Sequence, residues 1–137
     1  MLGPVCIVIA EDNYVLRRVV VQYLATFGIT AIEAGTETEA WSALATGGAD
    51  VLVLDMLISS TRTMLPFLQR IRKEPSMQDL PVVVTTAFEI ESLSSSDEGA
   101  CLAECFILQK PYDLCQLRRA IIQALGKRRK RLESSVS

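Results

Sequence analysis

Histidine is absent from this chain of 137 residues, and aromatic residues make up only 6% of it. Without histidine, the chain has no Ser–His or Cys–His nucleophile, and no histidine is present to complete a zinc site. The four cysteines show no Cys-x-x-Cys spacing; they are Cys6, Cys101, Cys105 and Cys115. This spacing does not indicate a thiolate metal centre. Whatever chemistry the chain performs must therefore use carboxylates, hydroxyls or amines.

Long hydrophobic runs are also absent. No apolar run approaches the roughly 18 residues of a membrane span, and the N-terminus lacks the basic and apolar pattern of a signal peptide. Half of the residues are hydrophobic, which favours a globular domain over a disordered chain. We expect one cytoplasmic domain of ordinary size, with no membrane insertion and with free thiols in a reducing compartment.

Basic residues are concentrated near the C-terminus. The net charge is −2, yet five of the 14 Lys and Arg residues stand together at 127–131. Such a segment can bind nucleic acid or an acidic lipid surface. No aromatic residues interleave with the basic ones, so we favour a solvated helix end or the start of a linker over direct nucleic-acid binding. The sequence thus predicts a domain over 1–126 and a basic tail or linker over 127–137.

Strand patterns and helix patterns alternate along the chain. The strand patterns cover 5–10, 29–34, 51–55, 82–84 and 106–108. The helix patterns begin at Asn13, at Thr36 or Thr38, near Pro66, near Glu91 and at Tyr112 or Asp113. The helix expected at 91–104 is weak because it contains three serines and a glycine, and a polar loop is expected at 59–63. This order predicts an α/β fold: a five-stranded, doubly wound parallel sheet with helices on both faces, flavodoxin-like (βα)5.

Polar residues stand where four of the five strand patterns end. They are Glu11 and Asp12 after the first strand, Asp55 at the end of the third, Thr85 and Thr86 after the fourth, and Lys110 after the fifth. Open α/β sheets bind ligands at the carboxyl ends of their strands, so we expect these side chains to form one site. Each also has a simpler role open to it, as a cap, a turn residue or part of an ordinary loop.

The pattern resembles the receiver domain of two-component response regulators over about residues 4–126. The resemblance rests on Glu11-Asp12, Asp55, Thr86 followed by the small Ala87, and Lys110-Pro111-Tyr112, in that order along the chain. It implies that Asp55 accepts a phosphoryl group from the phosphohistidine of a sensor histidine kinase or phosphotransfer protein. It also implies a phosphorylation-dependent switch and not an enzyme, since the domain would promote only its own phosphorylation and dephosphorylation.

The resemblance further implies a Mg²⁺ site. Clustered carboxylates persist at neutral pH only if a cation neutralises them or their pKa values rise, and hard oxygen ligands suit Mg²⁺. Asp12, Asp55 and the backbone carbonyl of Leu57 would supply oxygens, and Glu11 would ligate directly or through water. No residue is assigned to any other cofactor.

Two more side chains have roles in the family. Lys110 would pair with Asp55 and then with a phosphoryl oxygen as negative charge spreads over it. Thr86 would donate a hydrogen bond to another phosphoryl oxygen, a contact that exists only after phosphorylation. The signal would pass to a downstream effector protein or to a C-terminal output domain outside this sequence.

Two segments depart from the family pattern. The loop after Asp55 lacks the glycine and the first proline of the usual Met-Pro-x-Met-Asp-Gly-like turn. The position three before Lys110 holds Ile107 in place of the Tyr or Phe that couples phosphorylation to the partner surface. The adjacent Phe106 faces the other side of the strand unless the strand carries a bulge. The chemistry is therefore expected to be intact, while the coupling mechanism stays open.

Three other functions compete with phosphorylation as interpretations of the sequence. A phosphatase of the haloacid-dehalogenase kind needs a second aspartate two residues after the nucleophile, where this chain has Leu57. A flavodoxin-like mononucleotide binder needs a loop rich in glycine or hydroxyl residues after the first strand, where Glu11 and Asp12 would repel a phosphate. A receiver-like module that binds a partner without phosphorylation remains the main alternative.

Overall fold

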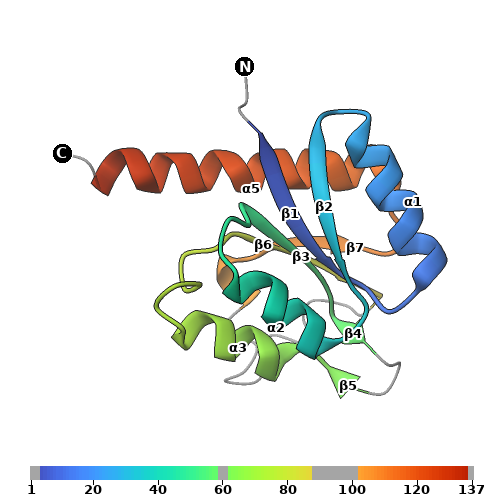
Figure 1. Ribbon diagram of the computed structural model, residues 1–137, viewed down its shortest axis with the longest axis horizontal. Helices are drawn as coiled ribbons and strands as arrows, with labels where there is room; N and C mark the ends of the chain where they lie inside the picture. The colour runs from blue at the N-terminus through green and yellow to red at the C-terminus, as the bar shows by residue number, and fades with distance from the viewer. Residues whose placement is uncertain (1–3, 59–61, 88–101, 136–137) are drawn as a thin grey trace.

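The main sheet has five parallel strands in the order β2-β1-β3-β6-β7 (Figure 1). The computed structural model describes residues 4–58, 62–87 and 102–135. The strands are β1 (Val5–Ala10), β2 (Ile29–Ala34), β3 (Val51–Asp55), β6 (Val82–Thr86) and β7 (Phe106–Gln109). From β1 the chain adds β2 on one side of the strand and β3 and the later strands on the other, as in doubly wound, flavodoxin-like domains. The predicted fold class is confirmed.

Helices cover both faces of this sheet (Figure 1). One face carries α1 (Tyr14–Ala25) and α5 (Leu114–Ser135), and the other carries α2 (Glu37–Ala45) and α3 (Leu65–Lys73). Most of the helix expected at 91–104 lies outside the described residues, and 102–104 form a short 3-10 turn. In the described ranges, no helix is both long and apolar enough to cross a membrane.

Side-chain caps define where three of these helices begin. Asn13 accepts a hydrogen bond of 3.0 Å from a backbone N–H of the first turn of α1. Thr36, and not Thr38, does the same for α2 at 3.1 Å. At the start of α5, Asp113 and Gln116 each accept a 2.8 Å bond from the backbone N–H of the other. Such a cap typically contributes about 1 kcal/mol to stability. Since it fixes the residue at which the helix begins, it also positions the end of the preceding loop.

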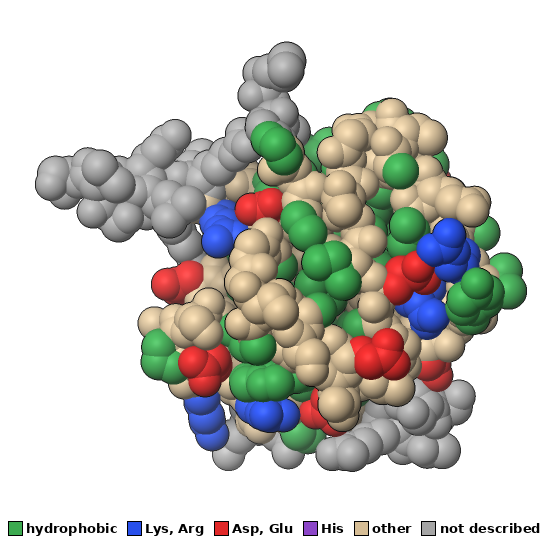
Figure 2. Space-filling model, viewed as in Figure 1, with side chains coloured by type: hydrophobic (Ala, Val, Ile, Leu, Met, Phe, Trp, Pro, Cys, Tyr) green, Lys and Arg blue, Asp and Glu red, His purple; other side chains and the backbone are tan. Residues whose placement is uncertain are grey.

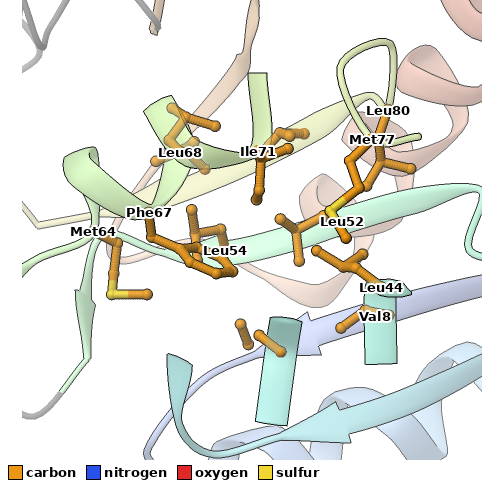
Figure 3. Packing of buried hydrophobic residues seen from close by; sticks show 14 of the residues in the cluster. Val8, Leu44, Leu52, Leu54, Met64, Phe67, Leu68, Ile71, Met77 and Leu80 are labelled. Carbon is orange, nitrogen blue, oxygen red and sulfur yellow. The ribbon is translucent and has the colours of Figure 1, made fainter. Parts of the chain in front are cut away.

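The central strand β3 is buried on both faces. Val51 and Val53 pack in the core under α1 and α5, while Leu52 and Leu54 pack in the core under α2 and α3. Figure 3 shows Leu54 beside Phe67 of α3. Full burial of one such side chain contributes about 1.5–3 kcal/mol. The two cores therefore fix β3, and with it the position of the residue that ends the strand.

The segment after β3 differs from the polar loop expected at 59–63. Here β4 (Leu57–Ile58) pairs antiparallel with β5 (Arg62–Thr63). The N–H of the buried Met64 donates to the carbonyl of the buried Met56 at 2.8 Å, next to this pairing. The expectation of a loop was wrong for 62–63, where the antiparallel pairing is held beside the bond between the buried Met56 and Met64, and 59–61 lie outside the described residues.

Helix α5 continues past residue 126, where the sequence suggested the end of the domain. It runs to Ser135 and includes the basic residues, and in Figure 1 its C-terminal part extends beyond the sheet. Arg128 donates to the carbonyl of Ala49 at 2.8 Å and lies 3.6 Å from the Asp50 carboxylate. The first basic turn is thus attached to the domain, and the division between 1–126 and 127–137 stays a prediction.

The β6–β7 pairing has a regular register through Phe106 and Ile107, which pair with Val83 and Val84. Phe106 packs towards the core under α1 and α5, and Ile107 packs towards the core under α2 and α3. This pairing contains no bulge, so the phenylalanine lies on the face opposite to the isoleucine.

Candidate functional site

The carboxyl ends of β1, β3, β6 and β7 surround one hollow of about 280 Å³. Its lining residues are Glu11, Asp12, Asn13, Asp55, Met56, Leu57, Thr86, Ala87 and Lys110. The lining includes every polar residue that the sequence analysis placed at a strand end except Thr85. Residues far apart in the sequence are therefore brought together at one edge of the sheet, as expected for the carboxyl ends of parallel strands.

The acidic pair follows β1 directly. The N–H of Glu11 donates to the Ala34 carbonyl at 3.0 Å, which extends the pairing of β1 with β2 by one residue. Glu11 is buried, whereas Asp12 is exposed. With α1 capped at Asn13, the two acids are held in the short connection between a buried strand and a helix.

Asp55 ends β3 and is held on two sides. One carboxylate oxygen accepts a 3.3 Å hydrogen bond from the Leu57 N–H, and the other lies 3.3 Å from the Lys110 ammonium. Only 8% of the Asp55 side chain is exposed. The Lys110 N–H donates to the Thr86 carbonyl at 2.8 Å, which fixes the lysine backbone beside the end of β6. A buried carboxylate is thus paired with a cation, as its burial requires.

The two threonines at the end of β6 are both buried, but they differ in place. Thr86 lines the hollow, while Thr85 pairs with Asp55 along the sheet and is not among the lining residues. Since successive residues of a strand point to opposite faces, the structure favours Thr86 as the site hydroxyl.

The three acids form the electrostatic centre of the hollow. Carboxylate oxygens of Glu11, Asp12 and Asp55 lie within 4.8 Å of one another. Burial raises the pKa of Glu11 to about 8, and the hydrogen bond and negative charge of Asp55 act in the same direction. The Asp12 charge also raises this pKa, and the Lys110 charge lowers it. At neutral pH the fold therefore keeps a proton on Glu11 unless a cation replaces it.

These residues fit a divalent cation that prefers oxygen ligands. The group offers three carboxylates, with Leu57 lining the same hollow, and its members include no thiolate or imidazole. Such a donor set suits Mg²⁺ or Ca²⁺ better than Zn²⁺. Burial is the main cause of the raised Glu11 pKa, and the neighbouring Asp55 and Asp12 charges, which also raise it, are ones that a cation would offset.

One residue near the site was missed by the sequence analysis. Arg17 of α1 is only 13% exposed, and its guanidinium donates to the Glu11 carbonyl at 2.6 Å. A charged residue among the inward positions of an amphipathic helix is a signal, because buried charges are normally paired. Its partners lie on other elements, so the sequence alone could not identify them.

A family model for the response regulator receiver domain matches residues 7–122. Over 127 residues the chain is 29% identical to the DNA-binding transcriptional regulator NtrC of Rhizobium meliloti (strain 1021), a match that covers 91% of this chain and 25% of that protein. The NtrC of Azospirillum brasilense is 27% identical, with the same coverage. The chain thus spans about a quarter of the length of the curated relatives it matches.

Solved structures show the same fold. A response regulator receiver protein from Sinorhizobium medicae WSM419 superposes with a TM-score of 0.76 at 22% identity, covering 93% of this chain and 99% of that one. The Vibrio cholerae chemotaxis protein CheY4 superposes with a TM-score of 0.77 at 20% identity, covering 90% of this chain and 100% of that one.

In metal-free buffer, the free energy of unfolding should fall as the pH rises from about 5 to about 8. The Glu11 pKa is about 8 in the folded protein, against an ordinary value of 4.5. Between these values the folded state keeps a proton that the unfolded state releases, so rising pH favours unfolding. Glu11→Gln removes the titrating group and should flatten this dependence. Urea unfolding across this range, in the presence of a chelator, measures the effect.

Glu37→Gln, at an acid of α2 outside the hollow, is the matched control and should keep the wild-type slope. Equal slopes for wild type and Glu11→Gln would contradict the assignment of the proton to Glu11.

Proposed function

The chain belongs to the response regulator receiver domain family, and on that basis we propose that it is a phosphoacceptor switch. Its donor would be the phosphohistidine of a sensor histidine kinase or phosphotransfer protein, and its acceptor Asp55. The observation that carries the proposal is the surroundings of Asp55: a buried carboxylate paired with Lys110, within 4.8 Å of two further carboxylates. Family membership supports the general role.

Asp55 would act as the nucleophile. One of its carboxylate oxygens attacks the phosphorus of the donor, a P–O bond forms, and the P–N bond to the donor imidazole breaks. The product is an acyl phosphate, and the imidazole leaves with the electron pair of the broken bond and takes up a proton. The contacts from the Leu57 N–H and the Lys110 ammonium orient the carboxylate for this attack.

We propose Mg²⁺ as the cofactor, held by Asp12, Asp55 and the Leu57 carbonyl, with Glu11 as a ligand directly or through water. When bound, the ion supplies positive charge that offsets the carboxylates and the phosphoryl oxygens. Without such an ion, three carboxylates and an incoming phosphoryl group would share one small hollow, with Lys110 as the cation that lines it among the described residues.

Lys110 and Thr86 would respond to the product. The ammonium of Lys110 moves its contact from the Asp55 carboxylate to a phosphoryl oxygen, and the Thr86 hydroxyl donates to another. Contacts that exist only in the phosphorylated state shift the equilibrium between two conformations. The domain is then a switch and not an enzyme, since it acts on no substrate beyond its own aspartate.

An apolar surface beside the hollow fits the docking of a donor protein. A groove of about 820 Å³ has Leu16, Val19, Pro111, Tyr112 and Leu114 among its lining residues. Ala87 and Lys110 line both this groove and the acidic hollow. On α1, Tyr14 and Val15 are exposed as well, at 65% and 69%. We name the side chains of these residues of α1, together with Pro111, Tyr112 and Leu114, the α1–α5 apolar surface. We propose that the phosphohistidine protein binds there.

The output would lie outside residues 1–126. The relative NtrC is a DNA-binding transcriptional regulator, and this chain matches only 25% of it. We propose that the receiver controls either a separate effector protein or an output domain joined through the basic segment 127–137. The attachment of Arg128 to Asp50 is consistent with a connector that begins as a continuation of α5.

Asp55→Asn should abolish phosphorylation while the protein stays folded. Asparagine keeps the shape of the side chain but cannot form the acyl phosphate, and it removes one of the repelling charges. Intact mass after incubation with acetyl phosphate and Mg²⁺ measures the outcome. Asp50→Asn, at an acid outside the hollow, is the control and should be phosphorylated like wild type.

Phosphorylation of Asp55→Asn at the wild-type level would place the nucleophile elsewhere. No phosphoryl mass on the wild type would instead favour the alternative, a receiver-like module that binds its partner without phosphorylation.

Mg²⁺ should stabilise the wild type, and Asp12→Ala should lose that stabilisation. A ligand that binds only the folded state adds about 2.7 kcal/mol at a hundredfold excess over its Kd. Thermal unfolding with and without millimolar Mg²⁺ measures the shift, and Asp79→Ala, at an acid remote from the hollow, should respond like wild type. An unchanged wild-type Tm would remove the metal site from this account.

Val15→Glu should slow transfer from a phosphohistidine protein without changing transfer from acetyl phosphate. A charge on the α1–α5 apolar surface disrupts contact with a protein donor, whereas a small donor needs only the hollow. Ile122→Glu introduces the same charge at an exposed position of α5 outside the groove and serves as the control. If Val15→Glu slows both donors equally, or neither, the proposed surface is wrong.

A further inference from the structure

The side chain of Arg17 connects helix α1 to the loop that carries the two acids. Its Nη1 donates to the Glu11 carbonyl at 2.6 Å, and its Nε donates to Glu33 of β2 at 3.0 Å. The side chain is 13% exposed. A largely buried guanidinium with partners on two other segments is a structural link between α1, β2 and the acidic loop.

This contact completes the anchoring of the peptide groups on both sides of Glu11. The Glu11 N–H donates to the Ala34 carbonyl at 3.0 Å, and the Glu11 carbonyl accepts from Arg17. That carbonyl belongs to the peptide that joins Glu11 to Asp12. Because a peptide unit is planar, fixing its carbonyl also fixes the direction in which the chain continues to the Cα of Asp12.

Several neighbours hold the guanidinium in place. The Glu33 carboxylate pairs with both Arg17 and Arg18, and the Tyr14 ring lies 5.5 Å from the Arg17 guanidinium carbon. Figure 2 shows basic and acidic side chains side by side next to the N-terminal part of α1. The geometry is that of an arginine fork, which a lysine cannot reproduce.

Gly35, the residue that follows β2, leaves the space for this side chain. A Cβ at Gly35 would lie 3.1 Å from Nη1 of Arg17 and 3.6 Å from its guanidinium carbon. Any larger residue there would press on a guanidinium that is already held by Glu11 and Glu33. The position of Arg17 is thus set from several directions, and the glycine offers a way to disturb it without changing the arginine.

We propose that Arg17 is a positioning residue for the acidic site, which sets the orientation of Asp12 by holding the Glu11 carbonyl. The inference rests on the proposed function, because its consequence is weaker Mg²⁺ binding and slower phosphorylation when the contact is lost. Arg17 acts through its hydrogen bond to the Glu11 carbonyl.

The test compares Arg17→Lys and Arg17→Ala with Arg18→Ala. Arg18 pairs with the same Glu33, whereas the Glu11 carbonyl is bound by Arg17, so Arg18→Ala controls for loss of the ion pair alone. Loss of groups that orient metal ligands typically weakens metal binding by about 10- to 100-fold. We expect the Mg²⁺ Kd from calorimetry to rise by about tenfold or more in both Arg17 variants, and the rate of phosphorylation by acetyl phosphate to fall. Arg18→Ala should match wild type.

Gly35→Ala is an independent perturbation, useful if the Arg17 variants do not fold. It should weaken Mg²⁺ binding in the same direction but less, because the guanidinium is displaced and not removed. Gly126→Ala, where an added Cβ meets nothing within 4 Å, is the matched glycine control and should bind Mg²⁺ like wild type.

The amide nitrogen of Asp12 gives a readout that needs no metal, since it belongs to the same peptide as the Glu11 carbonyl. Its NMR shift should change in metal-free Arg17→Lys and Gly35→Ala and stay constant in Arg18→Ala. Unchanged Asp12 shifts and unchanged Mg²⁺ Kd values would overturn the inference, as would variants that lose stability but bind Mg²⁺ normally. If the wild type itself neither binds Mg²⁺ nor accepts a phosphoryl group, the proposed function fails, and the Asp12 shift still decides the role of Arg17.

Discussion

Repulsion among three carboxylates held within 4.8 Å of one another is the constraint on which the site depends. The fold imposes this cost: β3 is buried on both faces, so Asp55 cannot move away from the sheet edge, and Glu11 is fixed by its pairing with β2. Burial and the neighbouring carboxylates together raise the pKa of Glu11, and the Lys110 ammonium pairs with Asp55. A bound cation would offset this repulsion and would also offset the charge of an incoming phosphoryl group.

Much of this arrangement could be predicted from local sequence patterns. Apolar runs ending in polar residues gave the strands and the residues at their ends, and Asn13 was recognised as a cap because its side chain acts on its own helix. The antiparallel pairing of β4 with β5 was not predicted, since the neighbouring Met56 and Met64 are seen to be buried and bonded to each other only in the folded chain. Arg17 was missed for a similar reason. Its partner Glu33 is 16 residues away in the sequence and comes near it only when β2 pairs with β1.

The residues around Asp55 say more about the function of the domain than do those of β7. Around Asp55 the side chains, distances and family membership agree with phosphoryl transfer. At β7, Ile107 packs among aliphatic side chains in the core under α2 and α3, and the regular register keeps Phe106 on the opposite face. A signal that leaves this domain therefore cannot depend on an aromatic ring at position 107. The hydrogen bond from the Lys110 N–H to the Thr86 carbonyl joins the ends of β6 and β7 and offers a direct link between them.

The central claim is that a phosphoryl group becomes attached to the Asp55 carboxylate. Borohydride reduces an acyl phosphate to the corresponding alcohol, so treatment of the phosphorylated protein converts the modified aspartate to homoserine. Peptide mapping by mass spectrometry then identifies the position directly. The account predicts homoserine at position 55 in protein exposed to phosphohistidine donor and Mg²⁺, and none without donor. Homoserine at another acid, or a phosphorylated protein that yields none, would contradict it.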